Sequence, residues 1–289
     1  MVGVAVVDFV FLLDELPRDA TKYRTEEAVI VGGGCAANAA VAATRLGARV
    51  TLAGRVGDDL IGDLIVADLE RDGVDTTLVA RTPGAHSSYS SVYVDAGGER
   101  QIVNYRGTGL EDDLSWVSEV PAVDAVLVDT KWTVGATAAL DLARERGVPG
   151  IVDAEPPMDT RLLERASHIA FSRHGLESLT GPAHPAAALE ALGTRFEAWQ
   201  CVTDGANGVY LTSDASVEHL PGFEVEVIDT LGAGDVWHGA FALRIAEGAD
   251  ERSAIVFANA VAALKCAAGH GRAGSPDRPA VEGLLAADH

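Results

Sequence analysis

The sequence is short of cysteines and of long apolar runs, and each shortage argues against a class of protein. Its three cysteines, Cys35, Cys201 and Cys266, are far apart and form no paired motif. We therefore expect reduced structural thiols rather than a disulfide framework or a thiolate metal site. No apolar run approaches the roughly 20 residues that a membrane helix needs. No basic and apolar leader opens the chain, so we expect a cytoplasmic protein.

Basic residues are also scarce. The chain carries 22 Lys and Arg against 43 Asp and Glu, a formal net charge of −21, and only three of the basic residues are lysines: Lys22, Lys131 and Lys265. A surface of this charge repels nucleic acids and anionic membranes, so we expect neither as a partner. Hydrophobic residues make up 48% of the sequence, enough for a large buried core.

Short β-branched runs alternate with Ala- and Leu-rich runs that often end at a glycine. We expect strands at residues 2–7, 50–53, 125–129, 148–152, 168–171, 199–203 and 208–212. We expect helices at residues 36–46, 58–71, 134–146, 233–247 and 251–268. This alternation predicts an α/β fold of Rossmann-like type, with a mainly parallel sheet covered by helices on both faces.

Two segments, 9–31 and 85–106, interrupt the alternation with strand-like runs and no helix. Within the second segment, residues 88–94 and 99–103 flank the turn sequence Asp95-Ala96-Gly97-Gly98, which is typical of a β-hairpin. These pieces do not fit simply into a parallel core sheet. We expect them to form a small separate sheet, a lid over a site, within a single domain of residues 1–289.

The strongest local motif is Gly232-Ala233-Gly234-Asp235, which follows the strand-like residues 225–228 and opens a helix. Small residues let the backbone N–H groups at a helix N-terminus approach a phosphoryl group. A carboxylate in the same first turn can accept the proton of an attacking hydroxyl. The alternative is an ordinary helix with a glycine-rich start.

A second glycine-rich motif stands near the N-terminus. Gly32, Gly33 and Gly34 precede a helix that carries Asn38 in its first turn, and the Asn38 amide can both donate and accept hydrogen bonds. Asp8 follows the first expected strand, at the edge where open α/β sheets bind ligands. A carboxylate there can accept two sugar hydroxyls, although an isolated Asp at such a point is more often a turn residue.

Together these motifs resemble those of the ribokinase-like (PfkB) carbohydrate kinases. The resemblance rests on Gly33-Gly34-x-x-x-Asn38, on Val202-Thr203-Asp204-Gly205-x-x-Gly208 and on Asp229-Thr230-x-Gly232-Ala233-Gly234-Asp235-x-x-x-Gly239-Ala240. It implies transfer of the γ-phosphoryl group of ATP to a sugar hydroxyl. Asp235 would then be the base, and Gly232, Ala233 and Gly234 would form the anion hole. Asp8, Gly33, Gly34 and Asn38 would hold the sugar.

The resemblance also implies a nucleotide site, metal ions and a quaternary structure. Thr203, Gly205 and Gly208 would lie along ATP, and Asn259 would lie near the adenine. Mg²⁺ is expected with ATP, K⁺ is a further candidate near Asp229 and Thr230, and a homodimer through the lid is expected.

The sequence departs from the family pattern in one motif. The Asn-x-x-Glu motif that helps to arrange Mg²⁺ is replaced by Ser172 and Gly175, with Glu177 out of register. The metal ligands therefore stay unassigned. The first strand is also short when it begins at Met1, so an upstream start codon is an alternative.

The substrate is suggested by four polar residues that we expect at one edge of the fold: Lys22, Asn104, Arg106 and Lys131. Cations there, in a protein of negative charge, favour an anionic group on the sugar. The motifs Lys22-Tyr23, Asn104-Tyr105, Lys131-Trp132 and Lys265-Cys266 resemble those of the bacterial 6-deoxy-6-sulfofructose kinases, a subgroup that also lacks Asn-x-x-Glu. The resemblance implies that Lys22, Asn104 and Lys131 bind the sulfonate. Lys131 stands where that resemblance implies arginine, so a neutral sugar or a sugar acid stays an alternative.

Three other functions are weighed against a sugar kinase. The intact motif at 232–235 argues against a non-catalytic sugar-binding homologue. The polar lid argues against a nucleoside kinase, which needs an aromatic pocket. A Rossmann dehydrogenase is excluded because Val7-Asp8-Phe9-Val10 stands where a GxGxxG motif is needed.

Overall fold

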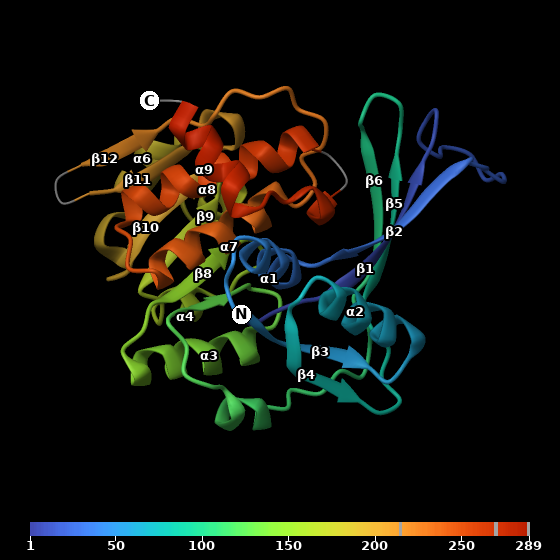
Figure 1. The fold of residues 1–289 in the computed structure, drawn as a ribbon, viewed down its shortest axis with the longest axis horizontal. Coiled ribbons are helices and arrows are strands. Elements are labelled where there is room, and N and C mark those ends of the chain that lie inside the picture. The colour runs from blue at the N-terminus through green and yellow to red at the C-terminus, as the bar shows by residue number, and fades with distance from the viewer. Residues whose placement is uncertain (214–215, 269–270, 288–289) are drawn as a thin grey trace.

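The computed structural model describes residues 1–213, 216–268 and 271–287. An α/β core forms most of the molecule, and a separate sheet of long strands stands along one side of it (Figure 1). None of the described helices is long and apolar enough to cross a membrane.

The larger core sheet has six strands in the order β12-β11-β10-β9-β8-β7. Its strands are β7 (Val126–Val128), β8 (Gly150–Ala154), β9 (His168–Ser172), β10 (Trp199–Thr203), β11 (Val209–Thr212) and β12 (Val217–Leu220). Strands β7 to β10 run parallel, and β11 and β12 add antiparallel pairs at one edge. The expected mainly parallel sheet is confirmed.

A parallel pair, β3 (Thr51–Gly57) and β4 (Asp75–Thr82), continues the core beyond β7. The two parts of the sheet meet at Val2, which makes parallel bridges to Ala53 on one side and to Val128 on the other. The short segment Met1–Gly3 therefore joins the pair to the larger sheet, since Met1 and Gly3 also hydrogen-bond to Ala53.

Helices cover both faces of the core. One apolar cluster packs beneath α1 (Cys35–Arg45), α7 (Ala233–Ala246) and α8 (Glu251–Ala268), and a second packs beneath α3 (Thr133–Arg146), α5 (Arg173–Thr180) and α6 (Pro185–Leu192). The remaining helices are α2 (Leu60–Arg71), α4 (Thr160–Leu163), α9 (Arg278–Ala287) and the 3-10 turns η1 (Ser115–Glu119), η2 (Gly193–Arg195), η3 (Gly205–Asn207) and η4 (Gly271–Gly274).

Helices α1 and α7 pack with their backbones in close contact. A Cβ atom at Gly239 of α7 would lie 2.3 Å from the carbonyl oxygen of Ala39 in α1, so only glycine fits there. The alanine-rich sequence of α1 makes the same approach possible on its side. Because the helices are this close, side chains in their first turns can meet.

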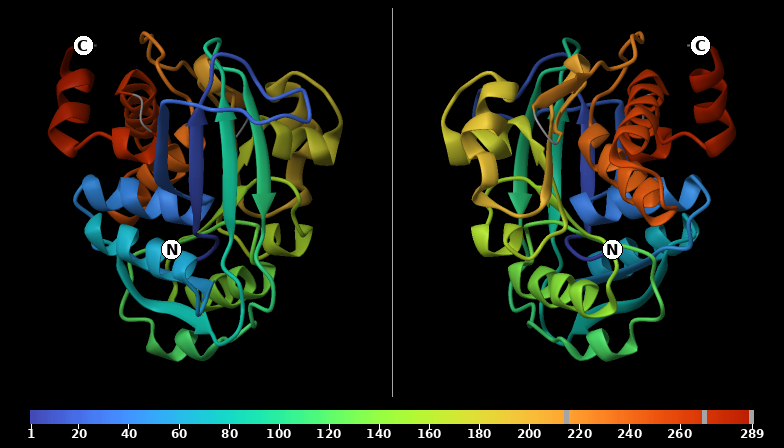
Figure 2. Two further views of the ribbon diagram at one scale, coloured as in Figure 1. Left: turned by 90° about the vertical axis from the view of Figure 1, so that its right-hand side faces the viewer. Right: turned by 90° about the vertical axis from the view of Figure 1, so that its left-hand side faces the viewer.

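The lid is a four-stranded sheet in the order β2-β1-β5-β6. Its strands, β1 (Val6–Leu12), β2 (Glu27–Gly33), β5 (Tyr89–Val94) and β6 (Arg100–Tyr105), lie side by side in Figure 2. The register aligns Asp8 with Ser90 and Ser90 with Asn104, so these three side chains share one face. The opposite face carries Phe9 and its neighbours.

The predictions of strands at residues 2–7 and 225–228 are wrong. Residues 2–7 do not form a core strand: only Val2 pairs with the core, and β1 begins at Val6 and belongs to the lid. Asp8 therefore lies within a lid strand rather than at the end of a core strand. Residues 225–228 also form no strand, since Val227 and Ile228 are 57% and 68% exposed and the Ile228 N–H donates to the Cys266 carbonyl instead.

Candidate active site

The two glycine-rich motifs meet at the N-terminus of α7. Gly232 takes a left-handed conformation with φ 73°, and Asp235 stands in the first turn that follows. The Asn38 Nδ2 atom, from the first turn of α1, donates to Asp235 Oδ2 at 2.7 Å. A Cβ at Gly232 would lie 3.3 Å from the same nitrogen. The close packing of α1 against α7 thus places Asn38 between the glycine turn and the carboxylate.

Asp8 and the second glycine motif form the lid side of the site. A Cβ at Gly33 would lie 2.3 Å from Asp8 Oδ2, so the glycine makes room for this carboxylate. Burial raises the pKa of Asp8, whereas a hydrogen bond from Ser90 and the charge of Arg272 lower it. The Asn104 amide donates to the Ser90 hydroxyl at 3.0 Å. A polar row from Asp8 to Asn104 therefore lines the inner face of the lid.

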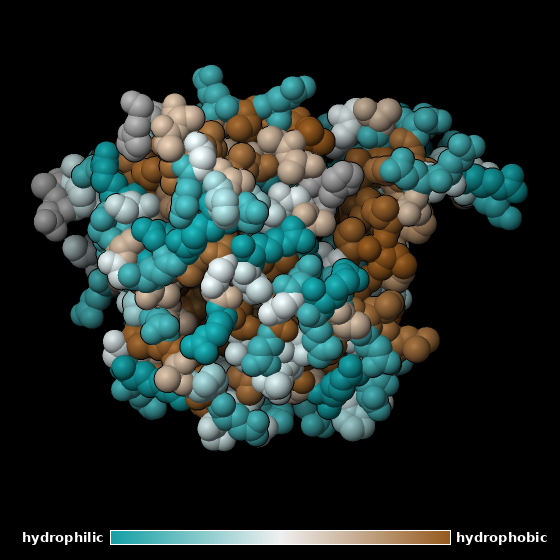
Figure 3. Space-filling model, viewed as in Figure 1, coloured by the Kyte–Doolittle hydropathy of each residue, from teal (hydrophilic) through white to brown (hydrophobic). Residues whose placement is uncertain are grey.

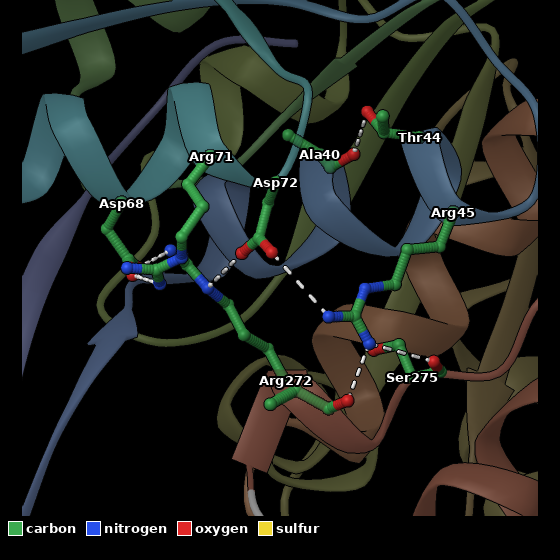
Figure 4. A network of polar contacts seen from close by, with 9 residues as sticks. Ala40, Thr44, Arg45, Asp68, Arg71, Asp72, Arg272 and Ser275 are labelled. Carbon is green, nitrogen blue, oxygen red and sulfur yellow. Dashed lines mark hydrogen bonds and ion pairs between the residues drawn. The ribbon is translucent and has the colours of Figure 1, made fainter.

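The Arg272 guanidinium lies against Asp68 and Asp72 (Figure 4). It pairs with Asp68 and lies 3.6 Å from Asp72 of the α2 C-terminus. Arg45 of α1 lies 3.5 Å from the same Asp72. A Cβ at Gly32 would lie 2.0 Å from Arg272 Nη2, so the guanidinium packs directly on the backbone of β2. One buried cation therefore holds the lid strand, α2 and η4 together.

Asp229 connects the lid to the loop before α7. Its carboxylate accepts from the backbone of Leu231 and Gly271, each at 2.8 Å, and pairs with the fully buried Lys265 at 3.2 Å. Arg100 of β6 reaches the same carboxylate at 2.9 Å. Burial opposes ionisation, but the hydrogen bonds from Leu231 and Gly271 and the charge of Lys265 lower the pKa of Asp229, so the group stays ionised.

Further carboxyl groups lie behind Asp235. Ligand atoms of Cys35, Asp153 and Asp235 all lie within 4.8 Å of one another. Burial is the main cause that raises the pKa of Asp235 to about 6. Burial, Asp129 and Glu155 raise the pKa of Asp153 to about 8. A thiol with two carboxyls differs from the all-oxygen surroundings that Mg²⁺ prefers, so we assign no metal ligand to this group.

The three candidate cations of the site differ in their placement. The Lys131 ammonium donates to the carbonyl oxygens of Glu155 at 3.3 Å and Pro156 at 2.7 Å, beside the carboxyl group just described. Lys22 is exposed on the connection between β1 and β2, and Arg106 is exposed just after β6. Among the described residues, neither side chain has a hydrogen bond or ion pair, so the structure does not tie either to the site.

The residues expected along the nucleotide lie at the end of β10 and beyond it. Thr203 ends β10, and Gly205 and Gly208 have φ of +57° and +95° in the turn that follows. A Cβ at Gly208 would lie 2.1 Å from the Leu220 carbonyl oxygen, so this turn packs tightly on β12. Asn259 is buried and joins the Trp237 indole at 2.8 Å to the Pro221 carbonyl at 3.0 Å.

Several residues of the site escaped the sequence analysis, among them Asp129, Asp153, His238 and Arg272. Asp129 and Asp153 could have been predicted from the sequence, since each stands at the end of an expected parallel strand. The carboxyl ends of such strands meet at one edge of the sheet, where ligands bind. A cavity of about 630 Å³, lined by Met1, Trp116 and Glu247, lies instead near the C-terminal end of α7, away from Asp235.

Comparison with known proteins agrees with this geometry. Residues 1–278 match the model of the pfkB family carbohydrate kinases. The chain is 30% identical to the ribokinase of Bacillus subtilis, over 99% of this chain and 98% of that one, and 26% identical to the deoxyribokinase of Salmonella typhi, over 88% of each. The crystal structure of an Agrobacterium tumefaciens protein superposes with a TM-score of 0.94 at 36% identity, covering 99% and 96% of the two chains.

The fold and the site define a phosphotransferase that acts on an alcohol group. More particularly, this chain belongs to the pfkB family and is a sugar kinase with a ribokinase-like fold.

Proposed function

We propose that the chain transfers the γ-phosphoryl group of ATP to a sugar hydroxyl, with Asp235 as the catalytic base. The contact between Asn38 and Asp235 carries the proposal, because it joins the sugar-side glycine motif to the phosphate-side motif. A sugar held by Asp8, Gly33, Gly34 and Asn38 would present its hydroxyl to Asp235. The backbone N–H groups of Gly232, Ala233 and Gly234 would stabilise the charge of the transferring group.

ATP would lie along Thr203, Gly205 and Gly208, with its adenine toward the helix that carries Asn259. Mg²⁺ would bind through the phosphates and water, because neither Ser172 nor Gly175 supplies a carboxylate. We assign Asp229 to a loop whose conformation would depend on bound K⁺. Its carboxylate accepts hydrogen bonds from the backbone N–H groups of Leu231 and Gly271, and it thereby holds the turn that precedes the anion hole.

The sugar we favour is an anionic ketose such as 6-deoxy-6-sulfofructose. Asn104 supports this choice, because it extends the polar row that begins at Asp8 and can donate to an anionic oxygen. Lys22 is exposed on the connection between β1 and β2 and would have to fold inward to reach the anion. Lys131 is held by backbone carbonyls and would add positive charge rather than a bidentate contact. A neutral ketose or pentose, or a sugar acid, is the alternative.

The chain would work as one domain of residues 1–289 whose lid comprises segments 9–31 and 85–106, and as a homodimer joined through that lid. The outer face of the lid supports the second point. Ile30, Tyr89 and Val103 are 61%, 38% and 63% exposed there, and apolar side chains gather over the lid in Figure 3. An exposed apolar sheet face of this kind is typical of a protein interface.

The proposal is tested by measuring ADP release with ATP and a panel of sulfonated, phosphorylated, acidic and neutral sugars. We expect kcat/KM to be highest for an anionic ketose, and Lys131→Gln to lower it more for the anionic sugars than for the neutral ones. Asp235→Asn should reduce kcat by at least about 10³-fold while ATP binding, measured by calorimetry, is kept.

A different experimental result would contradict each part of the proposal. Equal activity on neutral and anionic sugars would remove the anion site and leave the sugar kinase. Full turnover by Asp235→Asn would remove Asp235 as the base.

A further inference from the structure

His238 lies behind the catalytic turn in surroundings made almost wholly of hydrogen-bond acceptors. It is 2% exposed and stands one helical turn after Gly234 in α7. Its Nδ1 lies 2.8 Å from the Gly234 carbonyl oxygen, and its Nε2 lies 3.2 Å from the Ala170 carbonyl oxygen and 3.5 Å from Asp153 Oδ1. A neutral imidazole carries a proton on only one nitrogen, so the other nitrogen would face acceptors alone.

An additional proton on Asp153 gives the second ring nitrogen a donor, and the Ala170 carbonyl oxygen 3.2 Å away then accepts nothing from the ring. If Asp153 is protonated, its O–H can donate to His238 Nε2 while the Nδ1–H donates to the Gly234 carbonyl. Burial lowers the pKa of His238 and raises that of Asp153, so the proton belongs on the carboxyl. Asp153 is itself only 6% exposed, and a buried carboxyl without a proton or a cation is strongly disfavoured.

The charges around Asp153 favour the same state. Asp129 faces it from the end of β7, Glu155 from just after β8, Asp235 and His238 from α7, and Cys35 from α1. Lys131 is the cation that acts on it. Asp129, meanwhile, is held by the backbone N–H groups of Val4 and Lys131, at 2.7 and 2.9 Å. One ammonium cannot balance three neighbouring carboxylates, so retention of a proton relieves the repulsion.

We propose that Asp153 and His238 share one buried proton, and that this pair positions the Gly234 turn and Asp235 for phosphoryl transfer. The inference rests on the proposed role of Asp235. When the proton leaves in alkali, a second negative charge appears beside Asp235 and opposes the approach of the anionic phosphoryl group. The hydrogen bond that fixes His238, and through it the first turn of α7, is lost at the same time. The enzyme is then inactive although its substrates still bind.

The pH dependence of kcat, measured at saturating sugar and ATP, tests the pair. We expect the wild type to lose activity with an apparent pKa near 8. Asp153→Asn keeps a neutral donor at the same place, so it should retain at least about one third of kcat at pH 7 and lose little up to pH 9.5. Asp250→Asn, the same change at the exposed N-terminus of α8, should leave the alkaline limb unchanged. An alkaline limb that is the same in Asp153→Asn and the wild type would overturn the proposal.

A second measurement needs neither turnover nor the variant at 153. In ¹⁵N-labelled wild-type protein at pH 7, we expect the His238 ring to be neutral with its proton on Nδ1, assigned by comparison with His238→Gln. A ring protonated only on Nε2 would overturn the proposal even if every kinetic result agreed. Because this spectrum is independent of catalysis, an error in the role of Asp235 would be recognised separately.

Discussion

A buried carboxyl that must keep its proton costs folding free energy at neutral pH. Asp153 ionises near pH 3.8 when exposed and near pH 8 in the folded chain. A raised pKa gives stability that is present below the lower value and is lost as the pH rises through the upper one. Between these values the folded state must hold a proton that the unfolded chain releases, so stability falls by about 1.4 kcal/mol per pH unit.

Asp153→Asn removes this dependence. We expect the variant to gain stability over the wild type steadily from pH 5 to pH 8, and no further above that range. Urea unfolding at pH 5, 7 and 8.5 measures the difference. Asp250→Asn is the control, because hydrogen bonds from Ser253 lower rather than raise the pKa of Asp250. Asp250 is therefore ionised in both the folded and the unfolded chain at all three pH values, and its loss should destabilise the protein equally at each of them. A constant difference for Asp153→Asn would mean that its carboxyl is ionised in the native state.

At the scale of residues, the sequence identified the residues that belong to motifs. It did not identify the residues that hold those motifs in place through contacts made only in the folded chain. Asn38 and Asp235 were both recognised from glycine-rich motifs, and the structure places them in contact. His238 was missed because a lone histidine in an apolar helix has no pattern of its own. Its role depends on acceptors from Gly234 and Ala170, and Ala170 is 68 residues away along the chain.

At the scale of elements, the pair between Arg100 and Asp229 links the lid to the loop before the anion hole. The two side chains are 29% and 20% exposed, and such partly exposed pairs contribute about 0.2–1 kcal/mol. If the pair stabilises the lid over bound sugar, Arg100→Gln should raise the KM for sugar about two- to fivefold with a smaller change in kcat. Steady-state kinetics at low salt measure this change, since salt screens the pair.

The control for that prediction is Arg81→Gln, which removes an exposed ion pair with Asp63 outside the lid. Its KM for sugar should stay at the wild-type value. An equal rise in both variants would show that general charge, rather than the contact between lid and core, determines sugar affinity.

Elements with a clear start and end were predictable. The helix expected at 251–268 has those bounds in the structure, and the hairpin around residues 95–98 connects β5 to β6. The apolar run at 225–228 was misread because composition alone cannot distinguish a strand from an extended loop whose side chains are exposed. The lid strand β1 was misplaced for a different reason, since its apolar residues fit either sheet.

At the scale of the whole molecule, the outer face of the lid predicts the quaternary structure. Phe9 lies between Ile30 and Ser91 in register, and Ser91 is aligned with Val103, so a row of three apolar side chains and one serine crosses the sheet. We expect a dimer by light scattering at micromolar concentration, and Ile30→Lys or Val103→Lys should convert it to a monomer by placing a charge in the interface.

A matched control stands on the other side of the molecule. Val134 of α3 is 41% exposed, and Val134→Lys adds the same charge away from the lid. It should leave the mass unchanged. A wild-type chain that is monomeric throughout, or a dimer that survives both lid substitutions, would contradict an interface at this face.

The scarcity of lysine limits the positions at which the protein can be labelled through an amine. Of the three primary amines on side chains, Lys265 is wholly enclosed and Lys131 is occupied by carbonyl oxygens, which leaves Lys22 in the open on the lid. The Met1 amine donates to the Thr51 carbonyl oxygen at 2.7 Å. An acylating dye should therefore attach chiefly to Lys22, so the lid sheet can be labelled without engineering a new attachment site.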